Sequence, residues 1–252
     1  MPDFQSKGPV VARPVRANGS GSASPFSRRA TAMQQFPVFA TLSASEFKEV
    51  TSAAHEKLLP RRETIYNEGD PIREVFLLTA GCVKVTQLGP NGQEVILRLH
   101  GASELIGAQG LSAGKLHLAT ARAIQTSTAL VWEASVFEAI SDRIPSLRRN
   151  TARILGERLQ EMEERFREIS TQKVAPRLSH QLIRLMNQLG RGTDQSVEIG
   201  LSREELAQLT GTTLFTVSRL LSQWEKQGII SSRREAVVVC NVEALAALSE
   251  EG

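Results

Sequence analysis

Residues 201–230 have the pattern of two short amphipathic helices joined by a tight turn. Ser202 followed by Glu205 predicts a capping box at the start of the first helix. Gly211 suits the corner because glycine tolerates a positive φ, and Thr213 is a favourable N-cap for the second helix. The apolar positions predict the packing face of that helix: Leu214, Val217, Leu221 and Trp224.

The opposite face of the second helix carries Phe215, Ser218 and Arg219, which share one side at i, i+3 and i+4. A helix-turn-helix uses such a face near its helix N-terminus to reach base edges in the major groove. Arg219 can donate two hydrogen bonds to guanine, and nearby hydroxyl and cationic groups can hold phosphates. We therefore expect contacts with double-stranded DNA from Arg203, Thr212, Thr213, Phe215, Thr216, Ser218 and Arg219. An ordinary helical hairpin with a solvated polar face is the alternative.

A short β-hairpin is predicted directly after these helices. Gly228 fits the C′ position that ends a helix, and residues 229–239 read as two strands around a turn that carries Arg233 and Arg234. Residues 197–199 could add a third strand. A helix-turn-helix followed by a basic hairpin predicts a winged helix-turn-helix.

The first half of the chain has a different pattern. Residues 65–132 are short apolar segments separated by turn residues, which predicts an all-β barrel or sandwich. Asn91-Gly92 is the strongest hairpin signal and predicts a type I′ turn. Residues 39–59 are predicted as one or two helices, and residues 135–140 as another.

A long helix is predicted over residues 146–170, with Pro145 at its start. Its apolar residues are spaced four, three, four and three apart, which is a heptad seam: Leu155, Leu159, Met162, Phe166 and Ile169. Charged flanks favour a partner helix and hence a homodimer, whereas a lone helix packed on the strands would show the same stripe. Residues 174–189 predict one more helix, and residues 190–195 a loop.

Both halves resemble one known family. Residues 211–221 and 228–230 look like the C-terminal domain of the cAMP receptor protein/FNR family of bacterial transcription regulators. The upstream match to the family's N-terminal β-roll lies in residues 67–70, 76–78, 81, 83–85, 91–92, 94–97 and 106–107. The resemblance covers about residues 36–247, and two domains that match in the right order are more specific than either motif alone.

The resemblance implies an α+β fold with a jelly-roll-like β-roll, a long dimerisation helix and a winged helix-turn-helix. We expect a basic, disordered tail at 1–35, a sensor at 36–142, the dimerisation helix at 143–172 and a DNA-binding domain at 173–252. The implied function is that of a dimeric transcription regulator that binds an inverted repeat, with half-sites about 34 Å apart. RNA polymerase is an expected partner and activation an expected outcome, although no residue distinguishes activation from repression.

The sensor departs from the cAMP-binding members of that family. Those members carry a Glu where this chain has Ala108, an Arg-Ser pair where it has His117-Leu118, and a Thr-Ser pair where it has Met162-Glu163. A bidentate Arg is the natural clamp for a phosphate. We therefore expect an unidentified small effector other than cAMP, in a pocket formed by Ile106, Gly107, Ala108, His117, Leu118 and Met162.

Two other sensor chemistries can be weighed from the same residues. An FNR-type iron–sulfur cluster needs a group of N-terminal cysteines, and residues 1–81 contain none. A haem that senses nitric oxide or carbon monoxide stays open, with His100, His117 and Met162 as candidate ligands. The alternative for both histidines is a surface or packing role.

The predicted reading face also departs from the family. Relatives usually carry Glu four residues before the Arg, whereas this chain has Phe215. Phenylalanine cannot accept a hydrogen bond but can contact a thymine methyl group. Ser218-Arg219 matches the FNR-like pair, so a T-G element in each half-site is expected.

The charge of the chain adds little to the DNA prediction. The net charge is +3 and the isoelectric point about 9.1, but the basic excess lies in a Pro/Gly/Ser-rich tail. Residues 1–32 carry one acidic residue, Asp3, against Lys7, Arg13, Arg16, Arg28 and Arg29. This tail is either an arm that adds phosphate contacts or a dispensable extension, with Met33 as the true start.

Several classes of function are excluded or disfavoured. No run of 18 apolar residues predicts a membrane span, and no apolar segment follows the basic N-terminus as in a secretory signal. Cys82 and Cys240 form no disulfide or metal pattern, so we expect a reduced cytoplasm and no metal. Enzyme motifs are missing, so the remaining alternative is a ligand-binding module that has lost DNA binding.

Overall fold

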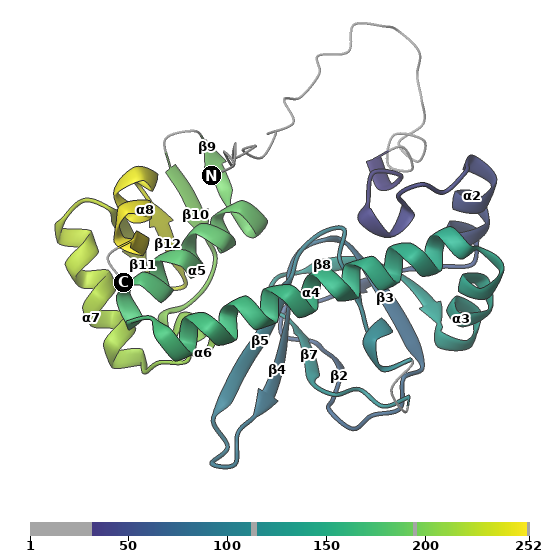
Figure 1. Ribbon diagram of the computed structural model, residues 1–252, viewed down its shortest axis with the longest axis horizontal. Helices are drawn as coiled ribbons and strands as arrows, with labels where there is room; N and C mark the ends of the chain where they lie inside the picture. Colours follow the sequence, from purple (N-terminus) through teal and green to yellow (C-terminus); the bar gives the residue numbers. More distant parts are fainter. Residues whose placement is uncertain (1–31, 112–114, 194–195, 251–252) are drawn as a thin grey trace, which may run out of the picture.

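The computed structural model describes residues 32–111, 115–193 and 196–250. A long helix, α4 (Pro145–Thr171), runs along the length of the molecule and connects its two halves (Figure 1). The β-roll lies along the middle of α4, and the helices α2 (Ala44–Ser52) and α3 (Ala134–Arg143) lie near its N-terminal end. The C-terminal domain lies at the opposite end of α4.

The β-roll is built from two antiparallel four-stranded sheets, with strand orders β1-β8-β3-β6 and β2-β7-β4-β5. The strands are β1 (His55–Leu59), β2 (Thr64–Tyr66), β3 (Glu74–Ala80), β4 (Val83–Leu88), β5 (Glu94–His100), β6 (Leu105–Ile106), β7 (Thr120–Ala123) and β8 (Ser127–Glu133). Buried residues of both sheets, such as Phe76 and Val83, share one apolar cluster. This confirms the predicted jelly-roll-like β-roll.

Two details at the N-terminal side differ from the predictions. His55–Leu59 forms strand β1, paired with β8, and not the end of a helix. Residues 32–35, which we assigned to the tail, belong to the folded part, because Met33 is buried against the helices beside the roll. The rest of the predicted tail, residues 1–31, lies outside the described residues.

The β4–β5 hairpin turns differently from the type I′ prediction. Only Gly92 of the Asn91-Gly92 pair has a positive φ, of 74°. The Gly92 amide donates to Gly89 O at 2.9 Å, and the Gly89 amide donates to Gln93 O at 2.8 Å. The turn is therefore a longer loop in which glycine supplies a single left-handed residue.

The C-terminal domain contains α5 (Val174–Leu189), α6 (Arg203–Thr210), α7 (Leu214–Lys226) and α8 (Val242–Glu250). Its sheet has the order β11-β12-β10-β9, with β9 (Arg191–Thr193), β10 (Ser196–Ile199), β11 (Ile230–Arg233) and β12 (Ala236–Val239). The predicted wing and third strand are present. The predicted loop at 190–195 instead contains β9, and α8 was not predicted.

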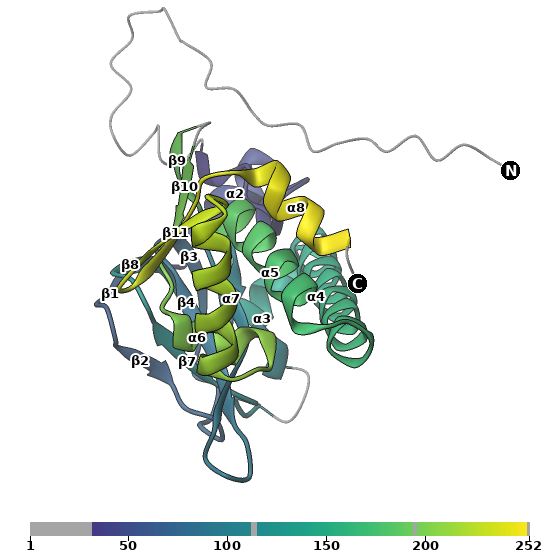
Figure 2. The ribbon, with the colours of Figure 1, turned by 90° about the vertical axis from the view of Figure 1, so that its left-hand side faces the viewer.

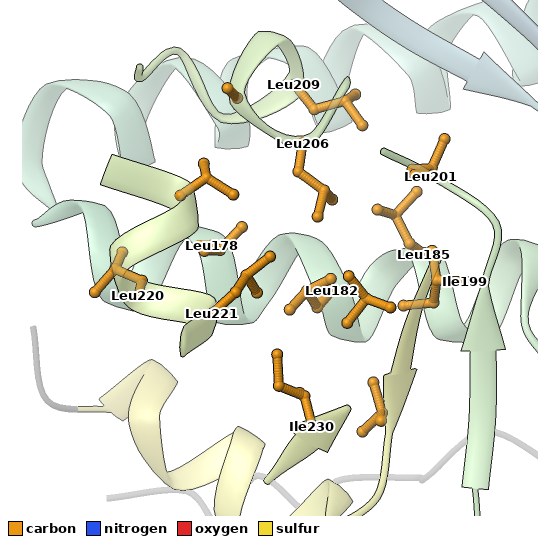
Figure 3. Packing of buried hydrophobic residues seen from close by; sticks show 14 of the residues in the cluster. Leu178, Leu182, Leu185, Ile199, Leu201, Leu206, Leu209, Leu220, Leu221 and Ile230 are labelled. Atoms are coloured by element: carbon orange, nitrogen blue, oxygen red, sulfur yellow. The ribbon is translucent and has the colours of Figure 1, made fainter. Parts of the chain in front are cut away.

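The C-terminal domain and the β-roll share one apolar core. Cys82, Ile96 and Leu99 of the roll belong to the same buried cluster as Leu182 and Leu206 of the C-terminal domain. Figure 3 shows ten labelled members of this cluster from the C-terminal domain, converging from α5, α6, α7 and the strands. Because α6 also packs on β5, the two domains form one continuous packed unit in this conformation.

Candidate nucleic-acid interface and effector cavity

The corner between α6 and α7 is held by the local interactions that the sequence predicts. The Glu205 amide donates to Ser202 Oγ at 3.2 Å and the Ser202 amide donates to Glu205 Oε2 at 2.8 Å, which completes a capping box. Gly211 ends α6 with a φ of 61°. Thr213 caps α7 by accepting from the Thr216 amide at 3.2 Å. These bonds satisfy helix N-terminal amides that would otherwise lack partners.

The predicted reading residues lie together on the outer side of α7. Phe215 is 77% exposed, an unusual state for a large apolar side chain. Arg219 and Thr213 are exposed, whereas Arg203, Thr212, Thr216 and Ser218 are partly exposed. Figure 2 views the molecule from this side, with α7 facing the viewer beside α6.

The packing face of α7 differs from the prediction at one position. Val217, Leu221 and Trp224 are fully buried, as expected, but Leu214 is 50% exposed. Leu220, which was not predicted to belong to the packing face, is buried. Leu214 lies in the first turn of α7, next to the reading residues, so this end of the helix presents two apolar side chains to solvent.

The wing carries its charges in pairs. Arg233 forms an ion pair with Glu198 at 2.5 Å, and Glu235 pairs with Arg61 of the β-roll at 2.8 Å. Arg234 is exposed. The pair between Glu235 and Arg61 connects the wing to the β-roll, in addition to the apolar core that the two domains share.

Helix α4 has one face on the β-roll and one face in solvent. Leu147, Ile154 and Arg158 are buried on the inner face. The predicted seam residues lie on the outer face, where Leu155 is partly exposed and the other four are exposed: Leu159 57%, Met162 61%, Phe166 72% and Ile169 46%. The alternative that the stripe packs on the strands of its own chain is therefore wrong.

A cavity of about 790 Å³ lies between β4, β5, α4 and α5. Four of the six predicted pocket residues line it: Gly107, His117, Leu118 and Met162. Ile106 and Ala108 do not, because both side chains are buried in the apolar clusters behind the cavity wall. The structure differs here because β6 ends at Ile106 and the chain turns at Gly107, which has a φ of 87°, so that Ile106 packs in the cluster between the sheets and Ala108 in the cluster beside α2 and α3.

His117 lies flat on Tyr66 in the cavity wall, with ring centroids 3.5 Å apart and planes within 5°. Burial lowers the pKa of His117 and raises that of Tyr66. Both rings therefore stay neutral near pH 7, and together they form a flat aromatic surface.

Glu104 joins the β-roll to α5 at another wall of the cavity. Its carboxylate accepts from Gln188 Nε2 of α5 at 2.6 Å and is bonded to His100 Nδ1 at 2.9 Å. Burial alone would raise the pKa of Glu104. The hydrogen bond with His100 and the positive charge of Arg98 have the larger effect and lower this pKa to about 2. Burial lowers the pKa of His100 to about 4. His100 is therefore neutral at pH 7, and Glu104 is charged.

Three arginines of this region were not singled out from the sequence. Arg98 lies 3.5 Å from Glu104 and is paired with Glu161. Arg165 donates to the carbonyl oxygens of Leu97 and Leu209, so α4 is bonded to both domains. Arg158, on the helix whose other charged side chains flank the seam, is buried at 7% exposure.

The signal that could have found Arg158 is its register. It lies four residues after Ile154, and residues four apart share one helix face. Arg98, Glu104 and Gln188 gave no such signal, because their meeting depends on how α5 packs against the roll.

Two further site classes can be checked in the structure. Within 32–111, 115–193 and 196–250, no group of three or more His, Cys, Asp or Glu side chains is placed to hold a metal ion. Over the same residues, no helix is long and apolar enough to cross a membrane.

Comparisons with known proteins agree with this architecture. Residues 56–143 match the family model of the cyclic nucleotide-binding domain, and residues 176–248 match that of the Crp-like helix-turn-helix domain. Electron transport regulator A of Shewanella oneidensis is 26% identical over 79% of this chain and 80% of its own. Transcriptional activator protein anr of Pseudomonas aeruginosa is 25% identical over 76% and 79%.

Solved structures show the same fold. FixK2 of Bradyrhizobium japonicum has a TM-score of 0.70 at 24% identity and covers 79% of this chain and 98% of its own. A CRP-family transcriptional regulator of Thermus thermophilus has a TM-score of 0.67 at 24% identity, with 78% and 97% covered. With both domains matched in order and regulators, not enzymes, among its relatives, the chain belongs to the cAMP receptor protein/FNR family of transcription regulators.

Proposed function

We propose that this regulator acts as a homodimer that binds an inverted-repeat operator under the control of a small effector other than cAMP. The observation that carries the proposal is the exposed heptad seam of α4 in a chain whose α7 reading face is also exposed. Leu159, Met162 and Phe166 form a continuous apolar row, which soluble proteins usually cover with a partner. A two-fold axis along the seam would bring two copies of α7 to successive major grooves, about 34 Å apart.

In this proposal α7 reads the bases and its surroundings hold the backbone. Arg219 donates to guanine, and Ser218 lies beside it as the second residue of the expected T-G contact. Phe215 contacts a thymine methyl group. Thr212, Thr213, Thr216 and Arg203 hold phosphates.

The cavity beside α4 is the proposed effector site. Its lining supports the expectation that cAMP is not the effector, because His117 is the one polar side chain at the positions of the phosphate clamp and the adenine contacts that lines the cavity, and Tyr66 stacks on its ring. Leu118 is 59% exposed, and Ala108 is buried away from the cavity. Glu163, on the outside of α4, does not line the cavity.

The haem alternative fits these residues poorly. Both candidate histidines line the cavity, but Nδ1 of His100 is bonded to Glu104 and the ring of His117 is covered by Tyr66. Charged side chains at the wall, among them Arg98, Glu104 and Arg158, would face an apolar macrocycle. We therefore do not assign haem to the cavity.

The remaining parts of the proposal follow the family. The functional division places the sensor at 36–142, the dimerisation helix at 143–172 and the DNA-binding domain at 173–252. Contact with RNA polymerase, activation of transcription and a cytoplasmic location are expected from relatives, one of which is named a transcriptional activator.

Selection of bound duplexes from a random pool would test the function. We expect wild-type protein to enrich an inverted repeat with a guanine in each half-site. Arg219→Ala should lose about 1–3 kcal/mol at that guanine and relax the preference there, whereas Lys226→Ala, at the far end of α7, should select the wild-type sequence. Enrichment of no repeat, or a uniform loss for Arg219→Ala across all sequences, would refute this assignment.

A further inference from the structure

Arg158 is a buried cation in the cavity wall without a carboxylate partner among the described residues. Its Nη2 donates to Leu105 O at 2.5 Å. Its Nε and Nη1 have no acceptor and are closed to solvent, so water does not satisfy them either. A guanidinium has five N–H donors and no acceptor, so most of its hydrogen-bonding capacity is unused in this state.

This arrangement is energetically unfavourable unless an acceptor binds to the free N–H groups of Arg158. Burial of a charged group without a partner costs several kcal/mol. Burial, together with the nearby charge of Arg98, lowers the Arg158 pKa to about 10. The side chain is still protonated near pH 7, so it remains a cation that an incoming anion would stabilise.

The other arginines of the cavity already have carboxylate or carbonyl partners, although the Nε atoms of Arg98 and Arg184 have no acceptor. Arg98 pairs with Glu104 and Glu161. Arg184 forms a two-point pair with Glu168 at 2.8 and 2.6 Å, and Arg165 is held by carbonyl oxygens. The wall therefore has room for one additional negative charge, and its three glutamates, Glu104, Glu161 and Glu164, disfavour a polyanion.

The rest of the wall is suited to an apolar body. The stacked rings of Tyr66 and His117 lie on one side, and the other apolar lining residues include Val85, Leu97, Leu99, Met162 and Leu185. A volume of about 790 Å³ is within the range of small-molecule sites.

We propose that the cavity binds an organic monocarboxylate, whose head group accepts hydrogen bonds from the Arg158 guanidinium and whose apolar body lies against the aromatic and aliphatic wall. This inference rests on the proposed function, in which the same cavity is the effector site. Because Leu185 and Gln188 of α5 line the cavity together with residues of β5, the bound carboxylate contacts both the sensor and the DNA-binding domain.

Isothermal titration calorimetry on the full chain tests the ligand class with matched probes. Benzoate and hexanoate carry the proposed head group, and benzamide and hexanamide are their neutral counterparts. We expect at least one carboxylate to bind wild-type protein more tightly than its amide. Arg158→Gln should weaken that binding about ten- to a hundredfold, the range for hydrogen bonds to a charged group, and Arg167→Gln, an exposed arginine of the same helix, should leave it unchanged.

Two results would overturn the inference: no binding of either carboxylate to wild-type protein, or equal binding of acid and amide. An unchanged affinity in Arg158→Gln would overturn the role of Arg158. If Arg158→Gln does not fold, Arg158→Lys replaces it; this variant keeps the charge and should retain a preference for the acid at reduced affinity. Carboxylate binding is measured without DNA, so its failure is distinguishable from a failure of operator selection.

Discussion

Phe166→Ala is the sharpest test of the α4 seam. The side chain is 72% exposed in the single chain, more than any other residue of the exposed row on the outer face of α4. Truncation removes the ring from the proposed interface and changes no buried contact of the monomer. The variant should therefore fold normally and dimerise weakly.

The size of the effect follows from the exposed fraction. Full burial of a phenylalanine contributes about 1.5–3 kcal/mol, so burial of the 72% that is exposed in Phe166 contributes about 1–2 kcal/mol per protomer. A two-fold interface contains the residue twice, which gives about 2–4 kcal/mol, or a dimer dissociation constant raised about 30- to 1000-fold.

Sedimentation equilibrium over a range of concentrations would measure that constant. Leu58→Ala is the matched control, because Leu58 is 61% exposed but lies on strand β1, away from α4. We expect the control to dimerise like the wild type and Phe166→Ala to lose affinity for an inverted repeat in parallel with dimerisation. A dissociation constant that changes less than about threefold, or equal weakening by Leu58→Ala, would show that the seam is not the interface.

Three further perturbations test the fold and its electrostatics. Ser202→Ala removes both side-chain bonds of the capping box and should lower the free energy of unfolding in urea by about 0.5–2 kcal/mol; no change would mean that Glu205 or water takes over the cap. Gly81→Ala would place a Cβ 2.5 Å from the Ser127 Cα at a φ of 91°, so its melting temperature should fall clearly, and a value within 1 °C (roughly the error of a melt) would contradict the described turn. Burial lowers the pKa of His100 from 6.5 to about 4, so His100 binds a proton more readily in the unfolded state than in the folded state. The free energy of unfolding should therefore decrease as the pH falls from 6.5 towards 4, by up to roughly 3 kcal/mol. His100→Gln should flatten this decrease, and a wild-type profile that is already flat would contradict the burial of a neutral imidazole.

Local patterns in the sequence were sufficient to predict helices α6 and α7 and the apolar stripe of α4. Capping at Ser202 and Thr213, the left-handed residue Gly211 and the heptad spacing of α4 all depend on neighbours within one or two helical turns. Such interactions are visible in a single sequence because the residues that make them are close in the chain.

Long-range pairing explains most of what was not predicted. His55–Leu59 was predicted as helix and is a strand because it pairs with β8, some 70 residues later. The loop between β4 and β5, with its single left-handed residue Gly92, and strand β9 are likewise set by partners across the sheet. The secondary-structure propensities of neighbouring residues do not predict which strands pair.

The cavity beside α4 shows the same limit more strongly. Gly107 and Met162 were predicted to line it, but Glu104 and Gln188 meet only because α5 packs on the roll. Arg158 resembles its exposed neighbours on α4, and its burial depends on which face of the helix turns inward. Apart from the register of Arg158, four residues after the buried Ile154, the sequence around these residues does not indicate that they meet at one site.

The shared apolar core has a consequence for synthesis of the protein. Ile96 and Leu99 of the β-roll are covered by residues of the C-terminal domain that are translated about a hundred positions later. A nascent chain that has completed the roll therefore presents bare apolar surface until α5 and α6 emerge, and this interval is when it is most prone to aggregate. Chains truncated after α4 should be less soluble than the full-length product, and the two domains of the finished protein should melt in one cooperative transition.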